Sequence, residues 1–161
     1  MREGASFNMV KIYIASDHAG FYLKKELIKY LGIKGYEVDD CGAYEMEEAD
    51  DYPDFIVPCA SRVARSKPGE AVGIVIGGSG NGEAIAANKV KGIRAAVYNS
   101  GTHLIAKAAK EHGNANILSL GARFISPDEA KKAITTWLEA EFEGGRHQRR
   151  IDKISELEKT K

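Results

Sequence analysis

Glycines and a carboxylate meet in one short segment of this chain, Gly77-Gly78-Ser79-Gly80-Asn81-Gly82-Glu83. Its glycines let the backbone turn sharply and bring bare N–H groups close to a ligand. A helix expected over 84–90 would add its positive dipole end, so the segment is typical of an anion site. Glu83 places a carboxylate beside that anion, which a loop that only binds phosphate would avoid. The pattern therefore indicates proton transfer next to a bound anion, with Glu83 as the base.

A second candidate group, Ser16-Asp17-His18-Ala19-Gly20, follows the first expected strand. In open α/β sheets, ligands bind at the carboxyl ends of strands where the strand order reverses. If the first and third strands are neighbours, Asp17 and His18 face the same crevice as Ser79 and Glu83. A dinucleotide fingerprint would need Gly-x-Gly-x-x-Gly after the first strand, and a P-loop would need Gly-Lys-Ser/Thr; neither is present.

Each candidate also has a purely structural interpretation. Acids favour the first turn of a helix, and the same dipole would lower the pKa of Glu83 and weaken it as a base unless burial opposes it. Asp17 can cap the next helix, and His18 can be a turn residue. His112 can be a packed residue at a helix end, and Arg146, Arg149 and Arg150 can form a solvated face. His147 falls on the apolar stripe of the last segment and is expected to pack there.

The elements that must position these residues alternate along the chain. Apolar runs predict five strands, over 10–15, 36–39, 72–76, 93–97 and 116–120, separated by segments with helical spacing. Ser126-Pro127-Asp128-Glu129 is a strong helix start, while Gly113 and Gly144 stand where helix ends are expected. The alternation predicts a single-domain α/β three-layer sandwich with a five-stranded parallel, Rossmann-like sheet of order 2-1-3-4-5. A polar segment, 147–159, with a thin stripe of Ile151, Ile154 and Leu157, predicts a C-terminal helix arm laid on the body or on a second subunit.

Chain length, net charge and cysteine content limit the possible classes of function. The 161 residues suggest one domain over 9–161, after a flexible N-terminal extension over 1–8. The formal net charge is zero, which argues against nucleic acid or a membrane surface as a partner. Two cysteines, Cys41 and Cys59, fit a reducing compartment, so we expect a cytoplasmic protein. The acidic stretch 45–51 is expected to be a solvated loop.

Several motifs, in order, give the chain a resemblance to a known family. Ser16–Phe21, Gly77–Glu83 and Gly144–Arg150 resemble the type B ribose-5-phosphate isomerases, a family that includes the galactose-6-phosphate isomerase subunits. Shorter matches lie between them: Asp51-Tyr52-Pro53, Ala86–Lys89, Gly92–Ala95 and Gly121-Ala122-Arg123. The resemblance covers about Val10 to Glu158.

The resemblance implies the interconversion of ribose 5-phosphate and ribulose 5-phosphate through ring opening and a cis-enediolate, with no metal and no cofactor. One subfamily carries a cysteine base where this chain has Gly77, whereas the other uses a glutamate at the position of Glu83. Cys41 and Cys59 lie elsewhere and are not expected to be the base.

The resemblance also assigns roles to other residues. His112 opens the ring, and Asp17 holds a sugar hydroxyl. The chemistry itself gives Ser79 a role, either to donate a hydrogen bond to O1 or O2 of the substrate or to relay its proton. Phosphate and sugar binding falls to His18, Tyr52, Gly78, Gly80, Asn81, Gly82, Arg123, Arg146 and Arg150. The family forms homodimers with shared sites, so we expect a homodimer, or a tetramer, in which His112 and Arg123 reach the neighbour's Glu83.

Two departures from the family pattern bear on the substrate. The family usually has His-Asn where this chain has His112-Gly113, and the segment around 99–101 is about two residues longer than usual. Both lie at the sugar end of the expected pocket. An isomerase of a tetrose or hexose phosphate therefore stays open as an alternative, and a non-catalytic sugar-phosphate-binding protein is a further one.

Overall fold

The computed structural model describes residues 9–160, so the extension expected over 1–8 lies outside the described residues. Five strands form one parallel sheet: β1 Lys11–Ser16, β2 Val38–Asp40, β3 Ala71–Gly77, β4 Ala95–Tyr98 and β5 Ile117–Gly121. The helices are α1 Phe21–Ile33, α2 Pro53–Arg65, α3 Asn81–Ala87, α4 Leu104–Glu111, α5 Pro127–Glu139 and α6 Arg146–Glu158. The predicted α/β class and five parallel strands are confirmed.

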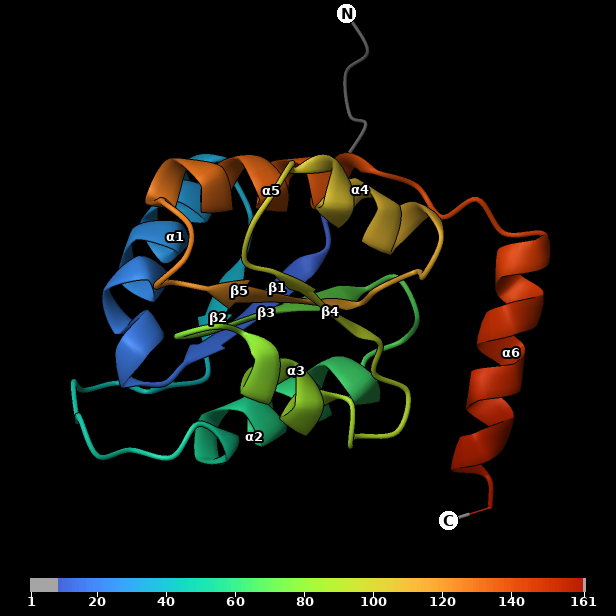
Figure 1. Cartoon of the computed structure of the whole chain (residues 1–161), viewed down its shortest axis with the longest axis horizontal. Helices are drawn as coiled ribbons and strands as arrows, with labels where there is room; N and C mark the ends of the chain where they lie inside the picture. Colours follow the sequence, from blue (N-terminus) through green and yellow to red (C-terminus); the bar gives the residue numbers. More distant parts are fainter. Residues whose placement is uncertain (1–8, 161) are drawn as a thin grey trace, which may run out of the picture.

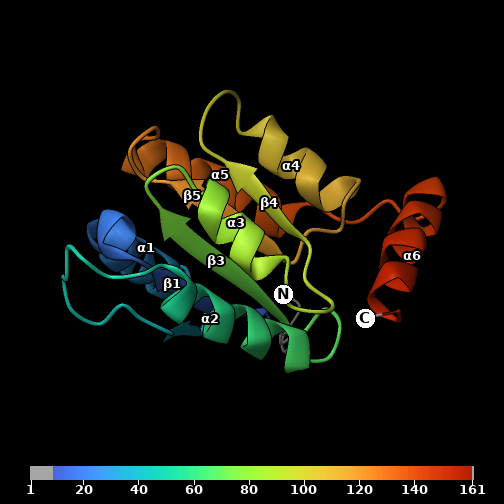
Figure 2. The same ribbon diagram turned by 60° about the horizontal axis from the view of Figure 1, so that its bottom comes forward.

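Two helical layers enclose the sheet. Helices α1, α4 and α5 cover one face and α2 and α3 cover the other, while α6 stands beside the body (Figures 1 and 2). The upper core gathers Ile12, Ile14, Leu27 and the fully buried Trp137, and the lower one gathers Ile56, Val75 and Ile117. Strands buried on both faces read as continuous apolar runs, which is why the sequence pattern located them.

The strand order is β2-β1-β3-β5-β4, so the expected order 2-1-3-4-5 is wrong in its last two strands. All of β5 is buried and it pairs with both β3 and β4, whereas the first three residues of β4 are only half-buried. The strand with less buried surface takes the edge. The neighbours β1 and β3 are unaffected, and the order reverses between them as the site requires.

The predicted helix ends are found at two of three positions. Ser126 and Glu129 form a capping box at the start of α5: Ser126 Oγ accepts from Glu129 N at 3.1 Å, and Glu129 Oε1 accepts from Ser126 N at 3.2 Å. Gly113 directly follows the C-cap of α4, as expected. Gly144 is not the end of α5, because that helix stops at Glu139; with φ of +68° it instead shapes the turn that leads into α6.

Helix α6 is the predicted C-terminal arm. Only His147 and Ile151 of it are buried, while Ile154 and Leu157 are 53% and 65% exposed. A cavity of about 490 Å³ separates it from the body, lined by Ile93, Ala96, Ile151 and Ile154 among others. None of the helices within residues 9–160 is long and apolar enough to cross a membrane.

Candidate active site

The glycine loop begins where β3 ends and leads directly into α3. Gly80, the N-cap of α3, has φ of +82°, a conformation that L side chains rarely adopt. The loop is held from β5 and the segment after it: the carbonyls of Gly77 and Gly78 accept from the N–H groups of Ala122 and Arg123. Ser119 Oγ donates to the Gly80 carbonyl at 2.6 Å. The backbone of the predicted anion site is therefore fixed before any ligand binds.

Glu83 lies in the first turn of α3 and is 4% exposed. Its carboxylate fills the space beside Gly77, where a Cβ would overlap it. Burial raises the pKa of Glu83 above its usual range and nearby Asp17 raises it further, while the backbone of Glu83 and Gly80 opposes the shift. From the sequence alone, the helix dipole is expected to lower the pKa of Glu83 unless burial opposes it, and in the structure burial outweighs the backbone contribution. A carboxyl with a raised pKa is better matched to general base chemistry near neutral pH.

Asp17 follows β1 at the same edge of the sheet. Its Oδ1 accepts from the N–H groups of Ala19 and Gly20 at 2.9 and 3.3 Å, so it is a helix cap as its structural interpretation predicted. It is 6% exposed and close enough to Glu83 to raise that residue's pKa. Capping fixes the carboxylate and leaves Oδ2 as an acceptor, so the cap does not exclude a binding role.

His18 is paired with a residue that the sequence did not single out. Its Nδ1 lies 2.7 Å from Asp50 Oδ1, and its backbone N–H donates to the same oxygen at 3.1 Å. The hydrogen bond to Asp50 raises the pKa of His18 above its ordinary value. A histidine that keeps its proton to higher pH is well suited to hold an anion. The expectation of a solvated loop over 45–51 is therefore wrong for Asp50, whose side chain is only 7% exposed.

Three further groups complete this crevice. The Tyr52 ring lies against Gly82, where an added Cβ would come within 2.7 Å of it. The Arg123 guanidinium lies beside Gly78, and its charge acts on His18. Asn99 Nδ2 donates to the Ser79 carbonyl at 2.9 Å, so the unusually long 99–101 segment supports the glycine loop. Arg123 thus belongs to the Glu83 site of its own chain, and the expectation that it reaches a neighbouring subunit is wrong.

Ser79 and Asn81 lie at the mouth of the loop. Ser79 Oγ accepts from the Asn81 N–H at 3.2 Å, which leaves the hydroxyl proton of Ser79 to be donated elsewhere. Asn81 is exposed in the first turn of α3. The Ser79 hydroxyl is therefore available to a molecule bound at the loop, whereas Asn81 lines a cavity between α3 and β4.

The remaining predicted residues gather at the opposite edge of the sheet. His112 is the C-cap of α4 and precedes β5, so it lies at the amino ends of the strands, whereas Glu83 lies at their carboxyl ends. Arg150 lines the same cavity as His112, and Arg146 begins α6 nearby. His147 is 7% exposed and packs there as predicted, with its pKa lowered chiefly by burial. Within one chain, the predicted site residues therefore fall into two groups at opposite ends of the strands.

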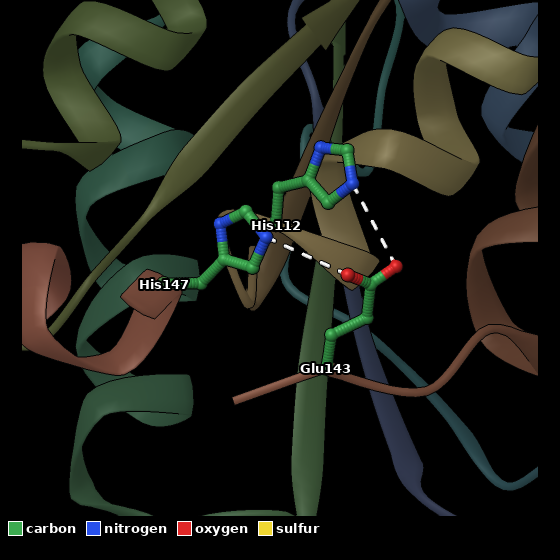
Figure 3. Close-up of side chains that lie close together, drawn as sticks. All are labelled: His112, Glu143 and His147. Atoms are coloured by element: carbon green, nitrogen blue, oxygen red, sulfur yellow. Dashed lines mark ion pairs between the residues drawn. The ribbon is translucent and has the colours of Figure 1, made fainter. Parts of the chain in front are cut away.

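Figure 3 shows His112 and His147 with Glu143, from the linker between α5 and α6. The two imidazole rings are stacked, 4.6 Å between centroids and 11° between planes. Glu143 spans both rings. No sequence pattern pointed to Glu143, because a single acidic residue in a linker is common.

Comparison with known proteins shows the family of this chain. A family model described as Ribose/Galactose Isomerase matches residues 12–154. The probable ribose-5-phosphate isomerase B of Mycoplasma genitalium is 46% identical over 154 residues, 96% of this chain and 97% of that protein. That of Mycolicibacterium paratuberculosis is 41% identical over 152 residues, 94% and 93% of the two chains.

Two solved structures resemble this chain in both fold and sequence. The crystal structure of Mycoplasma genitalium ribose-5-phosphate isomerase B with bound ribulose-5-phosphate has a TM-score of 0.90 at 44% identity, over 94% of this chain and 98% of that one. The Clostridium thermocellum ribose-5-phosphate isomerase B has a TM-score of 0.86 at 49% identity, over 94% and 99%.

Proposed function

Since the chain belongs to the ribose/galactose isomerase family and is an isomerase of the type B ribose-5-phosphate class, we propose that Glu83 is its base and ribose 5-phosphate its substrate. The observation that carries the proposal is Glu83 itself, buried beneath the glycine loop with a raised pKa and within reach of Asp17. A buried carboxylate at Glu83 with a second carboxylate, Asp17, nearby would not help to bind a phosphate. This pair therefore argues against a non-catalytic binding protein.

The reaction follows from these groups. Glu83 removes the proton from C2 of the open-chain aldose and returns it to C1, so that one carboxylate serves both steps. The enediolate oxygens face backbone N–H groups of the loop and the Ser79 hydroxyl, which stabilise the developing charge. Asp17 accepts from a sugar hydroxyl. Arg123 and protonated His18 attract the phosphate.

Ring opening and the remaining phosphate contacts require residues from the opposite edge of a second copy. We assign ring opening to His112, and further phosphate contacts to Arg146 and Arg150, of a partner subunit in a homodimer. Two observations support this: these residues lie far from Glu83 of their own chain, and the α6 stripe leaves Ile154 and Leu157 exposed. A symmetric dimer that places the His112 end of each chain against the Glu83 end of its partner would complete two sites at once. A cytoplasmic location is part of the proposal, and both cysteines are free thiols, as a reducing compartment requires.

Glu83→Gln tests the base. It preserves size and hydrogen bonding, so kcat should fall by ~10²–10⁴ while KM changes little. Cys41→Ser and Cys59→Ser are the matched controls and should stay active. Near-normal turnover of Glu83→Gln would refute the assignment. Comparing kcat/KM for tetrose, pentose and hexose phosphates tests the substrate, because Gly113 supplies no amide at the sugar end.

A complementation assay tests the shared site. Glu83→Gln and His112→Ala are each expected to be inactive, but mixed dimers would hold one intact site, so equilibrated mixtures should recover about a quarter of the wild-type activity. If both residues served the same chain's site, every mixed dimer would contain only broken sites. No recovery despite proven subunit exchange, or an active monomer in sedimentation, would refute the shared site.

A further inference from the structure

Three side chains able to bind a metal converge outside the glycine-loop crevice: His112, Glu143 and His147 (Figure 3). One ligand atom from each lies within 4.8 Å of the others. Glu143 Oε1 is 3.7 Å from His112 Nε2, and Glu143 Oε2 is 3.5 Å from His147 Nε2. The linker that carries Glu143 is fixed on α4, because the Glu143 N–H donates to the Glu111 carbonyl at 3.0 Å. The backbone of Glu143 is therefore fixed beside the two histidines.

These separations are too long for direct hydrogen bonds. Among the described residues, His147 Nε2 has no hydrogen-bond partner although its residue is 93% buried. An unpaired buried polar atom is costly, so a group that satisfied it would stabilise the cluster. Zinc lies about 2.0–2.2 Å from nitrogen and oxygen ligands, which places two tetrahedral ligands roughly 3.3–3.6 Å apart. The observed separations of 3.5 and 3.7 Å, one to each oxygen of Glu143, are close to that range, and the stacked rings must rotate to direct both Nε2 lone pairs at one ion.

We propose that His112, Glu143 and His147 form an inhibitory Zn²⁺ site. Two imidazoles and one carboxylate are a known zinc ligand set, with the fourth position open to water. Calcium and magnesium would not fit this site, because they prefer all-oxygen ligands. The inhibitory part rests on the proposed role of His112: zinc on its Nε2 would hold the imidazole on its own chain and remove it from the partner's substrate.

A second group of potential ligands, Asp17, His18 and Asp50, is already committed to other contacts. His18 Nδ1 contacts Asp50 Oδ1 directly at 2.7 Å, and Asp17 Oδ1 accepts from two backbone N–H groups. A metal would have to displace the direct His18–Asp50 hydrogen bond, whereas no direct hydrogen bond joins Glu143 to the two histidines. The second group serves as the internal control for the experiment.

Calorimetric titration of the metal-free protein with ZnCl₂ tests the site directly. We expect one zinc per chain, and an affinity more than ~100-fold weaker in Glu143→Gln and His147→Gln, because loss of a ligand should exceed the 10–100-fold cost of losing an outer-shell partner. Asp50→Asn and His103→Gln should bind as the wild type does. Glu143 is half-exposed, so its variant should fold even if the buried His147 variant does not. Unchanged binding in Glu143→Gln, or loss in Asp50→Asn alone, would overturn the proposal.

Activity assays separate the two parts of the inference. Zinc should inhibit the wild type, EDTA should restore it, and Glu143→Gln should be active and resistant to zinc. Zinc bound at one per chain without inhibition would overturn the inhibitory role. If the protein isomerised no sugar phosphate, the proposed function would fail while the titration still decided the zinc site. If it isomerised ribose 5-phosphate but bound no zinc, only this inference would fail.

Discussion

Replacing Gly77 with alanine should remove most of the activity while leaving the fold intact. An ideal Cβ on Gly77 would overlap the Glu83 carboxyl group, and its three nearest neighbours all belong to that group. Gly77 does not have a positive φ, so alanine fits the backbone and only Glu83 must move. The carboxyl is the far end of a flexible side chain, so the cost to stability should not exceed the ~1–3 kcal/mol typical of overpacking.

The effect on catalysis should be much larger. A displacement of about 1 Å can cost ~10²-fold in rate, and losing a positioned base costs ~10²–10⁴-fold. We therefore expect kcat of Gly77→Ala to fall by ~10²-fold or more, with KM nearly unchanged because the phosphate contacts are untouched.

Steady-state kinetics in two backgrounds checks this reasoning. In a chain that already carries Glu83→Gln there is no base left to displace, so adding Gly77→Ala should lower kcat little further. Gly32→Ala is the matched control, because a Cβ there meets nothing within 4 Å. Wild-type turnover in Gly77→Ala, or an equal loss in both backgrounds, would refute the steric link between residues 77 and 83.

Three other expectations follow from the same structure. Burial raises the pKa of Glu83, so its carboxyl group holds a proton more tightly in the folded state than in the unfolded chain. The free energy of unfolding therefore falls as the pH rises from the ordinary glutamate pKa through the raised one. In urea denaturation, Glu83→Gln should therefore be more stable than the wild type near pH 7 and match it below about pH 4; the reverse order at neutral pH would contradict the burial argument. Ser126→Ala removes the α5 cap and should lower the free energy of unfolding by about 0.5–2 kcal/mol; an unchanged value would mean that the capping box contributes nothing. Isomerisation in D₂O should place deuterium at C1 of the ketose by mass spectrometry, in metal-free buffer with or without EDTA; chelator-sensitive turnover without exchange would point to a metal-assisted hydride shift.

Local patterns in the sequence predicted the elements but not their lateral order. The strands lie within two residues of the predicted apolar runs, most closely for β1, β3 and β5, whose residues are mostly buried, and α5 begins at the predicted Ser126 cap. The exchange of β4 and β5 depends on which strand buries more surface in the assembled sheet. Arg94, next to β4, was the available sequence signal for an edge strand, and it is weak.

The site divides in the same way. Asp17 and Glu83 were predicted to share a crevice because the carboxyl ends of neighbouring parallel strands meet at one edge, and the Coulomb effect of Asp17 on Glu83 agrees with this. Asp50 was missed because its contact with His18 joins residues 32 positions apart, and an acidic stretch is usually solvated. Asn99 and Ser119 were missed for a related reason: they act on carbonyls of the glycine loop, which no spacing rule connects to them.

The overlap between residue 77 and Glu83 also limits how such an active site can evolve. The resemblance noted above separates chains with a cysteine at position 77 from chains with a glutamate at position 83. In this backbone a side chain at 77 would occupy the space of the Glu83 carboxylate, so the two bases cannot coexist in their working positions. On the proposed assignment, a cysteine gained at position 77 would displace the Glu83 carboxylate in the same step. The gain of one base is thus coupled to the loss of the other.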